Sequence, residues 1–342
     1  MKLKIAIMNG DDIGIEIVPM AKLVLTETLK YLNYSVELID LPIGKLAHSQ
    51  YGDTFPEYTV SQLNEVHGII CGPIGHNNYP RNDSTWTMPP IRKKFELYAA
   101  IRPAKSYDNS KNIDIIFVRE LTEGLQSSDT IVGGYPEFRP NDEITIASRV
   151  ITRKGSHRVA KAAFDLAVNK NRSKVTAAHK EPLFRLSCGM FLEECVKVSK
   201  EYPSISYEDI LIDTTAMHLV SNPESFDVVV TTNQFGDILS DIGAGLIGSI
   251  GMAPGLCLGD NIAMAQATHG SAPDIAGQGI ANPLAAILTA AMMLEFLGYP
   301  DLDKKVRAAV GKCLQQNQVT RELGGDLTTE QVTDAVIGHL SA

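Results

Sequence analysis

The sequence predicts an α/β fold with much parallel sheet, and two observations along its 342 residues support this. Short runs rich in β-branched residues alternate with longer helical patterns, which is typical of parallel strands joined by crossover helices. The one Gly-x-Gly-x-x-Gly match, Gly243 to Gly248, trails a helical segment. A dinucleotide fingerprint must leave a strand directly and open a helix, so the context excludes a Rossmann fold.

The expected elements follow in chain order. Strands are predicted at residues 5–8, 68–71, 113–118, 175–178 and 228–232, and helices at residues 15–31, 157–169, 189–201 and 283–297. Residues 130–151 alternate and carry Gly133-Gly134, so an antiparallel ribbon is predicted there. No repeat or flexible linker interrupts the pattern, so continuous secondary structure is expected to join two domains.

The composition limits the class of partner. Hydrophobic residues make up 44% of the chain and charged residues 21%, as in an ordinary globular protein. The formal net charge of −9 argues against nucleic acid or an anionic membrane as the main partner. The longest apolar run, residues 284–294, is too short to span a bilayer and fits a buried helix. Five cysteines without a CxxC pair indicate reduced thiols, so a cytoplasmic location is expected.

Three arginines give the strongest local signal. Arg92 and Arg102 flank a helical segment, and Arg119 follows an apolar strand, where ligand sites of α/β sheets concentrate. The planar guanidinium binds a carboxylate through two parallel N–H donors, so an anion site is one interpretation. The alternative is solvated surface charge, the usual environment of a single arginine.

Two acidic residues and a lysine are the next candidates. Asp237 and Asp241 are four residues apart after a strand, so both carboxylates lie on one helix face and suit Mg²⁺ or Mn²⁺. The alternative is an exposed helix turn, since acids are favoured near a helix N-terminus. Lys180 follows another strand, and a lysine beside cations and a metal can act as a base. By itself, an exposed lysine is the default.

Taken in order, these segments resemble the isocitrate/isopropylmalate dehydrogenase family of β-decarboxylating enzymes over nearly the whole chain. The most specific motifs are Asn233-Gln-Phe-Gly-Asp-Ile-Leu-Ser-Asp241 and His269-Gly-Ser-Ala-Pro-Asp-Ile-Ala-Gly277. The resemblance implies a two-domain isopropylmalate-dehydrogenase-like fold with a large mixed sheet. Residues 1–97 and 248–342 would form the cofactor-binding domain. Residues 98–247 would form the substrate, metal and dimerisation domain, with a β-arm near residues 130–151.

The implied activity is NAD-dependent oxidation and metal-assisted β-decarboxylation of a 3-substituted (R)-malate, such as isocitrate or 3-isopropylmalate, to a 2-oxo acid. By resemblance, the substrate carboxylates would be bound by Arg92, Arg102 and Arg119. Mg²⁺ or Mn²⁺ would be held by Asp237, Asp241 and the partner subunit's Asp213. Lys180, which would also come from the partner, would take the hydroxyl proton. A homodimer with shared active sites is therefore expected.

NAD is the implied cofactor, and the loop from His269 to Gly277 would bind it. The residues expected to contact the cofactor are Asn233, His269, Gly270, Ser271, Ala272, Pro273, Asp274 and Asn282. The carboxylate of Asp274 would accept hydrogen bonds from the ribose hydroxyls and repel a 2′-phosphate, which favours NAD⁺ over NADP⁺.

The sequence departs from the family pattern at several positions. Gln126 stands where the family has a tyrosine that protonates the enol, and glutamine cannot deliver a proton at neutral pH. Glu181 and Pro182 replace the usual alanine and asparagine after the lysine, and Gln266 replaces a usual glutamate. Either the enzyme is active on an unusual substrate, or the chain is a regulatory subunit or pseudoenzyme. The retained arginines, acids and lysine favour activity.

The sequence leaves the substrate open. The 3-substituent is expected to meet residues 79–91, where Met88 suits a small apolar or absent group better than a third carboxylate. Residues 244–255 look more like the isocitrate branch of the family, and tartrate or (R)-malate is a further alternative. A third hypothesis is a non-catalytic anion-binding protein, which would need neither metal nor cofactor.

Overall fold

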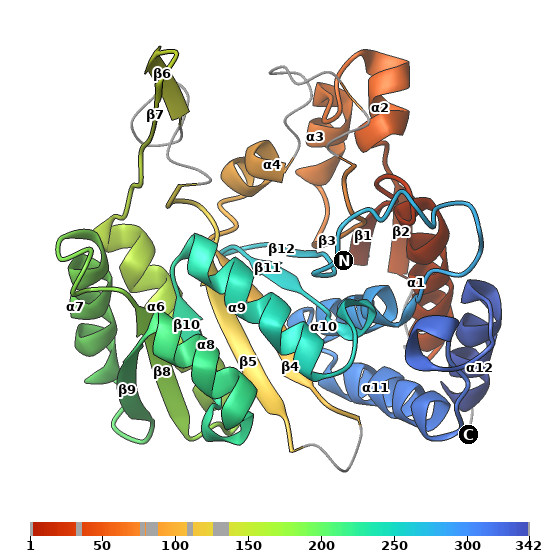
Figure 1. The fold of residues 1–342 in the computed structure, drawn as a ribbon. Coiled ribbons are helices and arrows are strands. Elements are labelled where there is room, and N and C mark those ends of the chain that lie inside the picture. Colours follow the sequence, from red (N-terminus) through yellow and green to blue (C-terminus); the bar gives the residue numbers. More distant parts are fainter. Residues whose placement is uncertain are drawn as a thin grey trace. The chain divides into compact units, whose positions relative to one another are not determined.

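The computed structural model describes residues 3–31, 36–75, 79, 88–107, 112–125 and 137–340. The chain divides into two compact units, Met1–Ile91 with Gly248–Ala342 and Arg92–Ile247. Each unit combines a sheet with helices, and the elements of both are labelled in Figure 1. The predicted mixed α/β fold is confirmed.

The first unit contains five strands in the order β2-β1-β3-β12-β11. β1 (Leu3–Met8) pairs in parallel with β2 (Val36–Asp40) and with β3 (Gly68–Cys71). β12 (Ala263–Ala265) is parallel to β3 and antiparallel to β11 (Leu256–Leu258). The helices of this unit are α1 (Gly14–Leu29), α2 (Gly44–Tyr51), α3 (Glu57–Leu63), α10 (Leu284–Phe296), α11 (Pro300–Gln315) and α12 (Thr329–Leu340), with the short 3-10 turns η3 (Ile250–Met252) and η4 (Arg321–Leu323).

The long apolar run of the sequence forms the centre of this unit. Every residue of α10 from Leu284 to Leu294 is buried, because the helix packs on α1 and α11 and against β3 and β12. A helix that is apolar on all sides must be enclosed on all sides, so the predicted buried helix is confirmed. No helix in the described ranges is long and apolar enough to cross a membrane.

In the described residues, the second unit contributes five strands to the large sheet, in the order β4-β5-β10-β8-β9. β5 (Asp114–Glu120), β10 (Val228–Thr231), β8 (Lys174–His179) and β9 (Ser206–Leu211) run parallel, and β4 (Ala99–Lys105) runs antiparallel to β5. The helices assigned to it are α6 (Arg153–Asn169), α7 (Ser187–Ser199), α8 (Ile212–Ser221) and α9 (Asn233–Leu246), with the short turn η2 (Pro223–Ser225); α4 (Met88–Lys94) carries the boundary between the units.

Both faces of the central strands in the second unit are covered. Ile115, Phe117 and Val229 share a buried cluster with Leu219 of α8 and Leu239 of α9. α6 also contacts β5, β8 and β10, and α7 contacts β8 and β9. Strands buried on both faces read as continuous apolar runs without alternation, which is why these segments were recognisable in the sequence.

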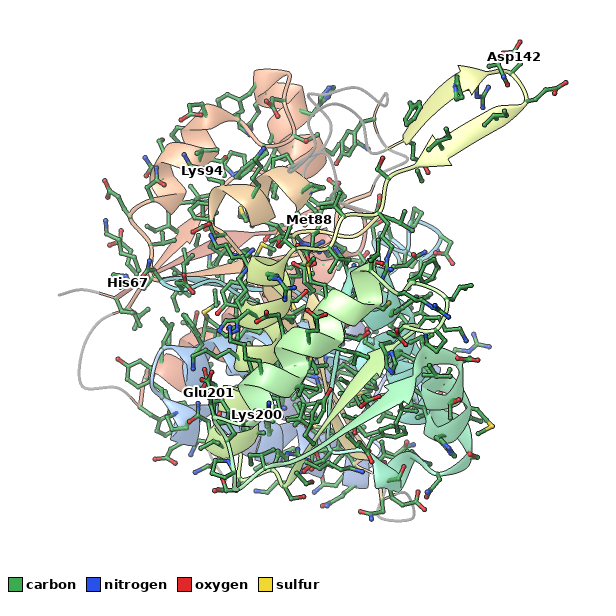
Figure 2. The ribbon with its side chains drawn as sticks, turned by 90° about the vertical axis from the view of Figure 1, so that its left-hand side faces the viewer. His67, Met88, Lys94, Asp142, Lys200 and Glu201 are labelled. Carbon is green, nitrogen blue, oxygen red and sulfur yellow. The ribbon has the colours of Figure 1, made fainter. Side chains whose placement is uncertain are left out.

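The predicted ribbon is present in the described part of residues 130–151. β6 (Glu137–Asn141) and β7 (Ile144–Ala147) form an antiparallel pair. The pair extends away from the sheet of its own unit in Figure 1, and Asp142 lies at its tip in Figure 2. Phe138, Ile144 and Ile146 are exposed on it, so the ribbon carries apolar side chains at the surface. Residues 130–136 of the predicted ribbon lie outside the described residues.

Two details differ from or refine the prediction. α6 begins at Arg153, one turn before the expected start at residue 157, so that boundary was wrong. The side chain of Thr152 accepts a hydrogen bond from the Gly155 N–H at 3.0 Å, and this cap starts the helix earlier than its apolar periodicity does. Gly243 and Gly245 lie inside α9, which confirms that their spacing is not a dinucleotide-binding turn.

Candidate active site

The carboxyl ends of four parallel strands bring the candidate polar residues of the second unit to one edge. Thr231 of β10 is in register with Arg119 of β5 and with Ala178 of β8, and Ala178 is in register with Ile210 of β9. Beyond this row, β10 leads into α9, β8 into the turn of Lys180 and β9 into α8. Ligand sites of α/β sheets lie at this edge.

Arg119 is held at the edge by α9. The residue is 3% exposed, and its Nε and Nη2 donate to Oδ1 of Asn233 at 3.0 and 2.8 Å. Its Nη1 donates to Oδ1 of Asp237. Asn233 in turn donates to the backbone carbonyl of Glu123 at 2.9 Å. Three of the guanidinium N–H groups therefore have fixed partners, and the direction of the side chain is set by the first turn of α9.

Arg102 converges on the same carboxylate from β4. Its Nη1 lies 3.1 Å from Oδ1 of Asp237 and 2.7 Å from Oγ of Ser240. The same nitrogen lies 3.9 Å from Oδ1 of Asp241. The two guanidinium groups thus meet at one carboxylate oxygen, which is the coordination that a bound anionic substrate would need. The structure brings Arg102 and Arg119 together around the Asp237 carboxylate.

One face of α9 supplies the partners of both arginines. Asn233, Asp237, Ser240 and Asp241 recur at helical spacing, so their side chains point the same way. Gly236, between them, allows the close approach. A Cβ at Gly236 would lie 2.6 Å from Cβ and 2.7 Å from Cγ of Arg119. The helix therefore packs directly on the arginine because this position has no side chain.

The paired carboxylates fit a hard divalent cation in their chemistry. Asp237 and Asp241 share a helix face as predicted, and burial raises the pKa of the Asp241 carboxyl above its usual range. A nearby divalent charge would reverse that rise, because it favours the ionised form. No group of three or more acidic, histidine or cysteine side chains able to hold a metal occurs within the described ranges. One copy of the chain therefore gathers two of the three predicted acidic ligands.

Lys180 and Asp213 form a separate pair at the ends of β8 and β9. Lys180 Nζ donates to Oδ1 of Asp213 at 2.7 Å. This hydrogen bond holds the pKa of the Asp213 carboxyl below its usual range. Asp213 lies in the first turn of α8, where the helix N-terminus also favours a negative charge. The predicted base and the third predicted metal ligand are thus neighbours.

A buried acidic pair lies behind this edge. Glu123 accepts hydrogen bonds from the backbone N–H and the hydroxyl of Thr152, at the start of α6. Burial, followed by the charge of Glu120, raises the pKa of Glu123 to about 7. Burial also raises the pKa of Glu120. The backbone carbonyl of Glu123 accepts a hydrogen bond from the Asn233 amide, so the acidic pair adjoins the residue that holds Arg119.

The remaining substrate candidates lie on α4. Arg92 is in this helix, and its buried Nε has no hydrogen-bond partner in the part of the chain that the structure describes. Met88 begins the helix and is 8% exposed. Gln266 donates to the Met88 sulfur and to the Gly72 carbonyl, both at 3.2 Å. The substitution at Gln266 and the candidate Met88 are thus in direct contact, which their separation in sequence did not reveal.

The predicted cofactor loop is anchored by the start of α1 in the first unit. Ile13 donates its N–H to the Ser271 carbonyl at 3.1 Å. Glu16 accepts hydrogen bonds from the N–H groups of Gly277 and Gly279. Ala272 adopts a φ of 41°, in the left-handed region that an alanine rarely occupies. These contacts hold the loop in a bent conformation.

Two orphaned polar atoms fit a nucleotide at this loop. Among the described residues, the buried Nε2 of His269 and the buried Nδ2 of Asn282 find no hydrogen-bond partner. The pKa of His269 is lowered by burial, so the ring is neutral, with Nδ1 facing the Gly270 carbonyl at 3.0 Å. Gly270, Ser271, Ala272 and Pro273 form the loop backbone, and Asp274 is exposed. Buried polar atoms without partners are expected where a ligand completes the structure.

Several residues of the site had no individual signal in the sequence. Ser240 could have been found from the helical face shared with Asp237, because it lies one turn beyond that residue. The contact of Asn233 with Arg119 depends on the strand register, which sequence does not give. Asn233 was expected to contact the cofactor, and in the structure its amide holds an arginine. Gln126 lies outside the described residues.

The fold and this edge define an α/β protein with two arginines on paired carboxylates and a lysine–aspartate pair at the same strand ends. Comparison with known proteins then identifies the family. Residues 4–336 match the family model described as isocitrate/isopropylmalate dehydrogenase. The chain therefore belongs to the isocitrate/isopropylmalate dehydrogenase family, a family of β-decarboxylating dehydrogenases.

Relatives of several names are similar over their full lengths. The chain is 40% identical to the homoisocitrate dehydrogenase of Methanocaldococcus jannaschii, over 99% of this chain and 98% of the relative. It is also 40% identical to the 3-isopropylmalate dehydrogenase of Archaeoglobus fulgidus, over 98% and 99%. The crystal structure of isocitrate dehydrogenase from Methylococcus capsulatus superposes with a TM-score of 0.90 at 36% identity, covering 99% of this chain and 100% of that one.

Proposed function

We propose that this protein catalyses the NAD-dependent oxidation and metal-assisted β-decarboxylation of a 3-substituted (R)-malate to a 2-oxo acid. The observation that supports it most is the convergence of Arg102 and Arg119 on the Asp237 carboxylate, beside Asp241. An anion site next to paired hard oxygen ligands suits a substrate that carries carboxylates and a chelating hydroxyl.

Different residues of the chain would bind the substrate, the metal and the cofactor. Arg102 and Arg119 would hold the substrate carboxylates, with Arg92 supplying a further N–H from α4. Asp237 and Asp241 would hold Mg²⁺ or Mn²⁺, which supplies polarisation of the 2-hydroxyl and of the carbonyl that forms from it. NAD⁺ would accept the hydride from C2, held by the loop of His269 and by Asn282.

Lys180 would take the hydroxyl proton as the carbonyl forms. Its hydrogen bond to Asp213 keeps the amine directed along the strand edge until the substrate arrives. After carbon dioxide leaves, the enolate needs a proton at C3. Gln126 cannot provide one, so we expect a water molecule to do so.

The site would be completed by a second copy of the chain. One copy gathers two acids around the arginines, and Asp213 with Lys180 would reach the partner's arginines. Exposed apolar side chains support such an interface, namely Met217 and Val220 of α8, Ile238 of α9 and the apolar side chains of the β6–β7 ribbon. Mixing Lys180→Ala with Arg119→Gln tests this directly. Hybrid dimers would carry one intact site, so about a quarter of the wild-type activity should return by random pairing.

The first experiment follows NADH formation with Mn²⁺ and a panel of (R)-malate, tartrate, isocitrate, homoisocitrate and 3-isopropylmalate, with carbon dioxide trapped in parallel. Turnover on one member that is abolished by Lys180→Ala and by metal chelation would support the proposal. A yield of carbon dioxide below that of NADH would show that oxidation occurs without complete decarboxylation.

A catalytically weak regulatory subunit is the second candidate, and the turn after Lys180 favours it. Pro182 has no backbone N–H and no amide side chain to offer a nicotinamide. This candidate predicts that NAD⁺ raises the melting temperature while no panel member is turned over. The absence of any thermal shift with NAD⁺ or Mn²⁺ would instead indicate the non-catalytic anion-binding alternative.

A further inference from the structure

The peptide bond that follows Lys180 is fixed on both sides. The Lys180 carbonyl accepts hydrogen bonds from the N–H groups of Leu183 and Phe184, at 3.2 and 2.9 Å. The Glu181 N–H at the other end of the same peptide donates to Nδ1 of His179 at 3.0 Å. Because the peptide is planar, these three contacts fix the backbone direction at Lys180.

His179 can accept that hydrogen bond in one tautomer. An Nδ1 that accepts from a backbone N–H carries no proton, so a neutral ring holds its proton on Nε2. Nε2 lies 3.3 Å from Oδ2 of Asp209, a carboxylate that favours a protonated nitrogen facing it. Ala177 is in register with Asp209, so His179, two residues further along β8, projects from the same face of the sheet. The strand pairing therefore determines the tautomer.

The surroundings leave the ring little freedom. The side chain of His179 is 6% exposed, whereas that of Asp209 is 48% exposed. The ring is thus enclosed and oriented from its outer end by a carboxylate at the surface. Pro182, the residue after Glu181, has no N–H of its own, so the Glu181 N–H is the last donor before the turn closes on the Lys180 carbonyl.

We infer that His179, oriented by Asp209, is a positioning residue for Lys180, and that it fixes the amine by holding the Lys180–Glu181 peptide plane. The inference rests on the proposed function only for the role of Lys180 as the base. Its structural part, the contact between the ring and the Glu181 N–H, can be tested without turnover.

Two substitutions separate positioning from simple packing. His179→Asn keeps an acceptor oxygen close to the place of Nδ1 and loses the contact with Asp209. His179→Gln extends to the place of Nε2, keeps a donor for Asp209 and loses the acceptor for Glu181. If His179 acts only by packing through Asp209, the glutamine variant should have the smaller effect. If His179 positions the Lys180–Glu181 peptide, the asparagine variant should have the smaller effect.

The direct readout is hydrogen exchange of the Glu181 amide. We expect exchange about tenfold faster in His179→Gln and within about twofold of wild type in His179→Asn, as for the loss of one hydrogen bond. Asp209→Asn is the second route, because it alters an exposed side chain and leaves the core intact. It should raise the exchange rate a few-fold by weakening the required tautomer. Equal exchange in both His179 variants would overturn the inference.

The catalytic readout is the split between kcat and KM on whichever panel member is turned over. His179→Gln should lower kcat at least tenfold with KM within about twofold, and His179→Asn should restore most of kcat. Unchanged kcat in a glutamine variant whose Glu181 amide exchanges fast would overturn the inference.

If wild type turns over nothing, the proposed function fails, and acylation of Lys180 by an activated ester decides the positioning. An amine released from Asp213 should be acylated several-fold faster in the glutamine variant alone, and equal acylation in both variants would refute positioning.

Discussion

Replacing Gly236 by alanine is expected to separate activity from stability. The new Cβ would lie 2.6 Å from Cβ, 2.7 Å from Cγ and 3.1 Å from Cα of Arg119. Ordinary carbon contacts need about 3.5–4.0 Å, so either the first turn of α9 or the arginine must move by about 1 Å. Asn233 and Asp237, which contact the Arg119 guanidinium, both lie on the first turn of α9, so the guanidinium cannot keep its direction.

The expected effect of Gly236→Ala on the free energy of unfolding is smaller than its expected effect on the rate. Overpacking costs about 1–3 kcal/mol, and the better helix propensity of alanine offsets about 1 kcal/mol of it. The net loss in the free energy of unfolding should therefore be about 1 kcal/mol. Displacing a substrate-binding group by about 1 Å can lower the rate about 100-fold. Activity should therefore fall far more than stability.

Gly245 provides the matched control on the same helix. A Cβ at Gly245 meets nothing within 4 Å. Gly245→Ala should raise the free energy of unfolding by about 0.5–1 kcal/mol and leave turnover unchanged. Urea unfolding and NADH formation measure both effects in both variants. The reasoning is refuted if Gly236→Ala matches Gly245→Ala in stability and keeps wild-type activity.

Three further changes test other parts of the site. The pKa of Glu123 is raised to about 7 in the folded chain, above the ordinary value of 4.5. Its contribution to the free energy of unfolding is therefore present below about pH 4.5 and is lost as the pH rises through 7, a loss on the order of 3 kcal/mol. Glu123→Gln should flatten the profile of urea stability against pH between about pH 5 and pH 8. Glu16→Gln keeps one of the two acceptor oxygens used by Gly277 and Gly279, so the Kd for NAD⁺ from thermal shift should rise about tenfold, with Glu27→Gln on the same helix as the control. Arg119→Lys keeps the charge and loses the two N–H donors to Oδ1 of Asn233, so KM should rise at least tenfold while the melting temperature falls modestly. An unchanged KM would remove Arg119 from the substrate site.

The sequence predicted the strands of the second unit well because their surroundings are simple. β10 and β5 are enclosed by helices on both faces, so burial alone dictates their apolar residues. The start of α6 was missed because a single side chain, Thr152, determines it, and an apolar pattern does not register a cap. Local chemistry of this kind is visible in sequence only when the capping residue is weighed separately.

Some features of the candidate site could likewise be predicted from the sequence, and others could not. The shared face of Asp237 and Asp241 follows from helical periodicity, so spacing was sufficient to predict it. The contacts of Arg102 with Ser240 and of His179 with Glu181 depend on strand register and on how a turn closes. Those features arise from long-range packing, and no local pattern in a single sequence encodes them.

The charged side chains of the candidate site form two groups, and the charges within each group are paired. Arg102 and Arg119 balance Asp237 and Asp241, and Lys180 balances Asp213. Each group is therefore close to neutral by itself. In the proposed function, a substrate with two carboxylates would bring two negative charges to the arginines, and a divalent cation would bring two positive charges to the aspartates. Each ligand would then relieve the charge imbalance created by the other, and by linkage each would strengthen the binding of the other by the same factor.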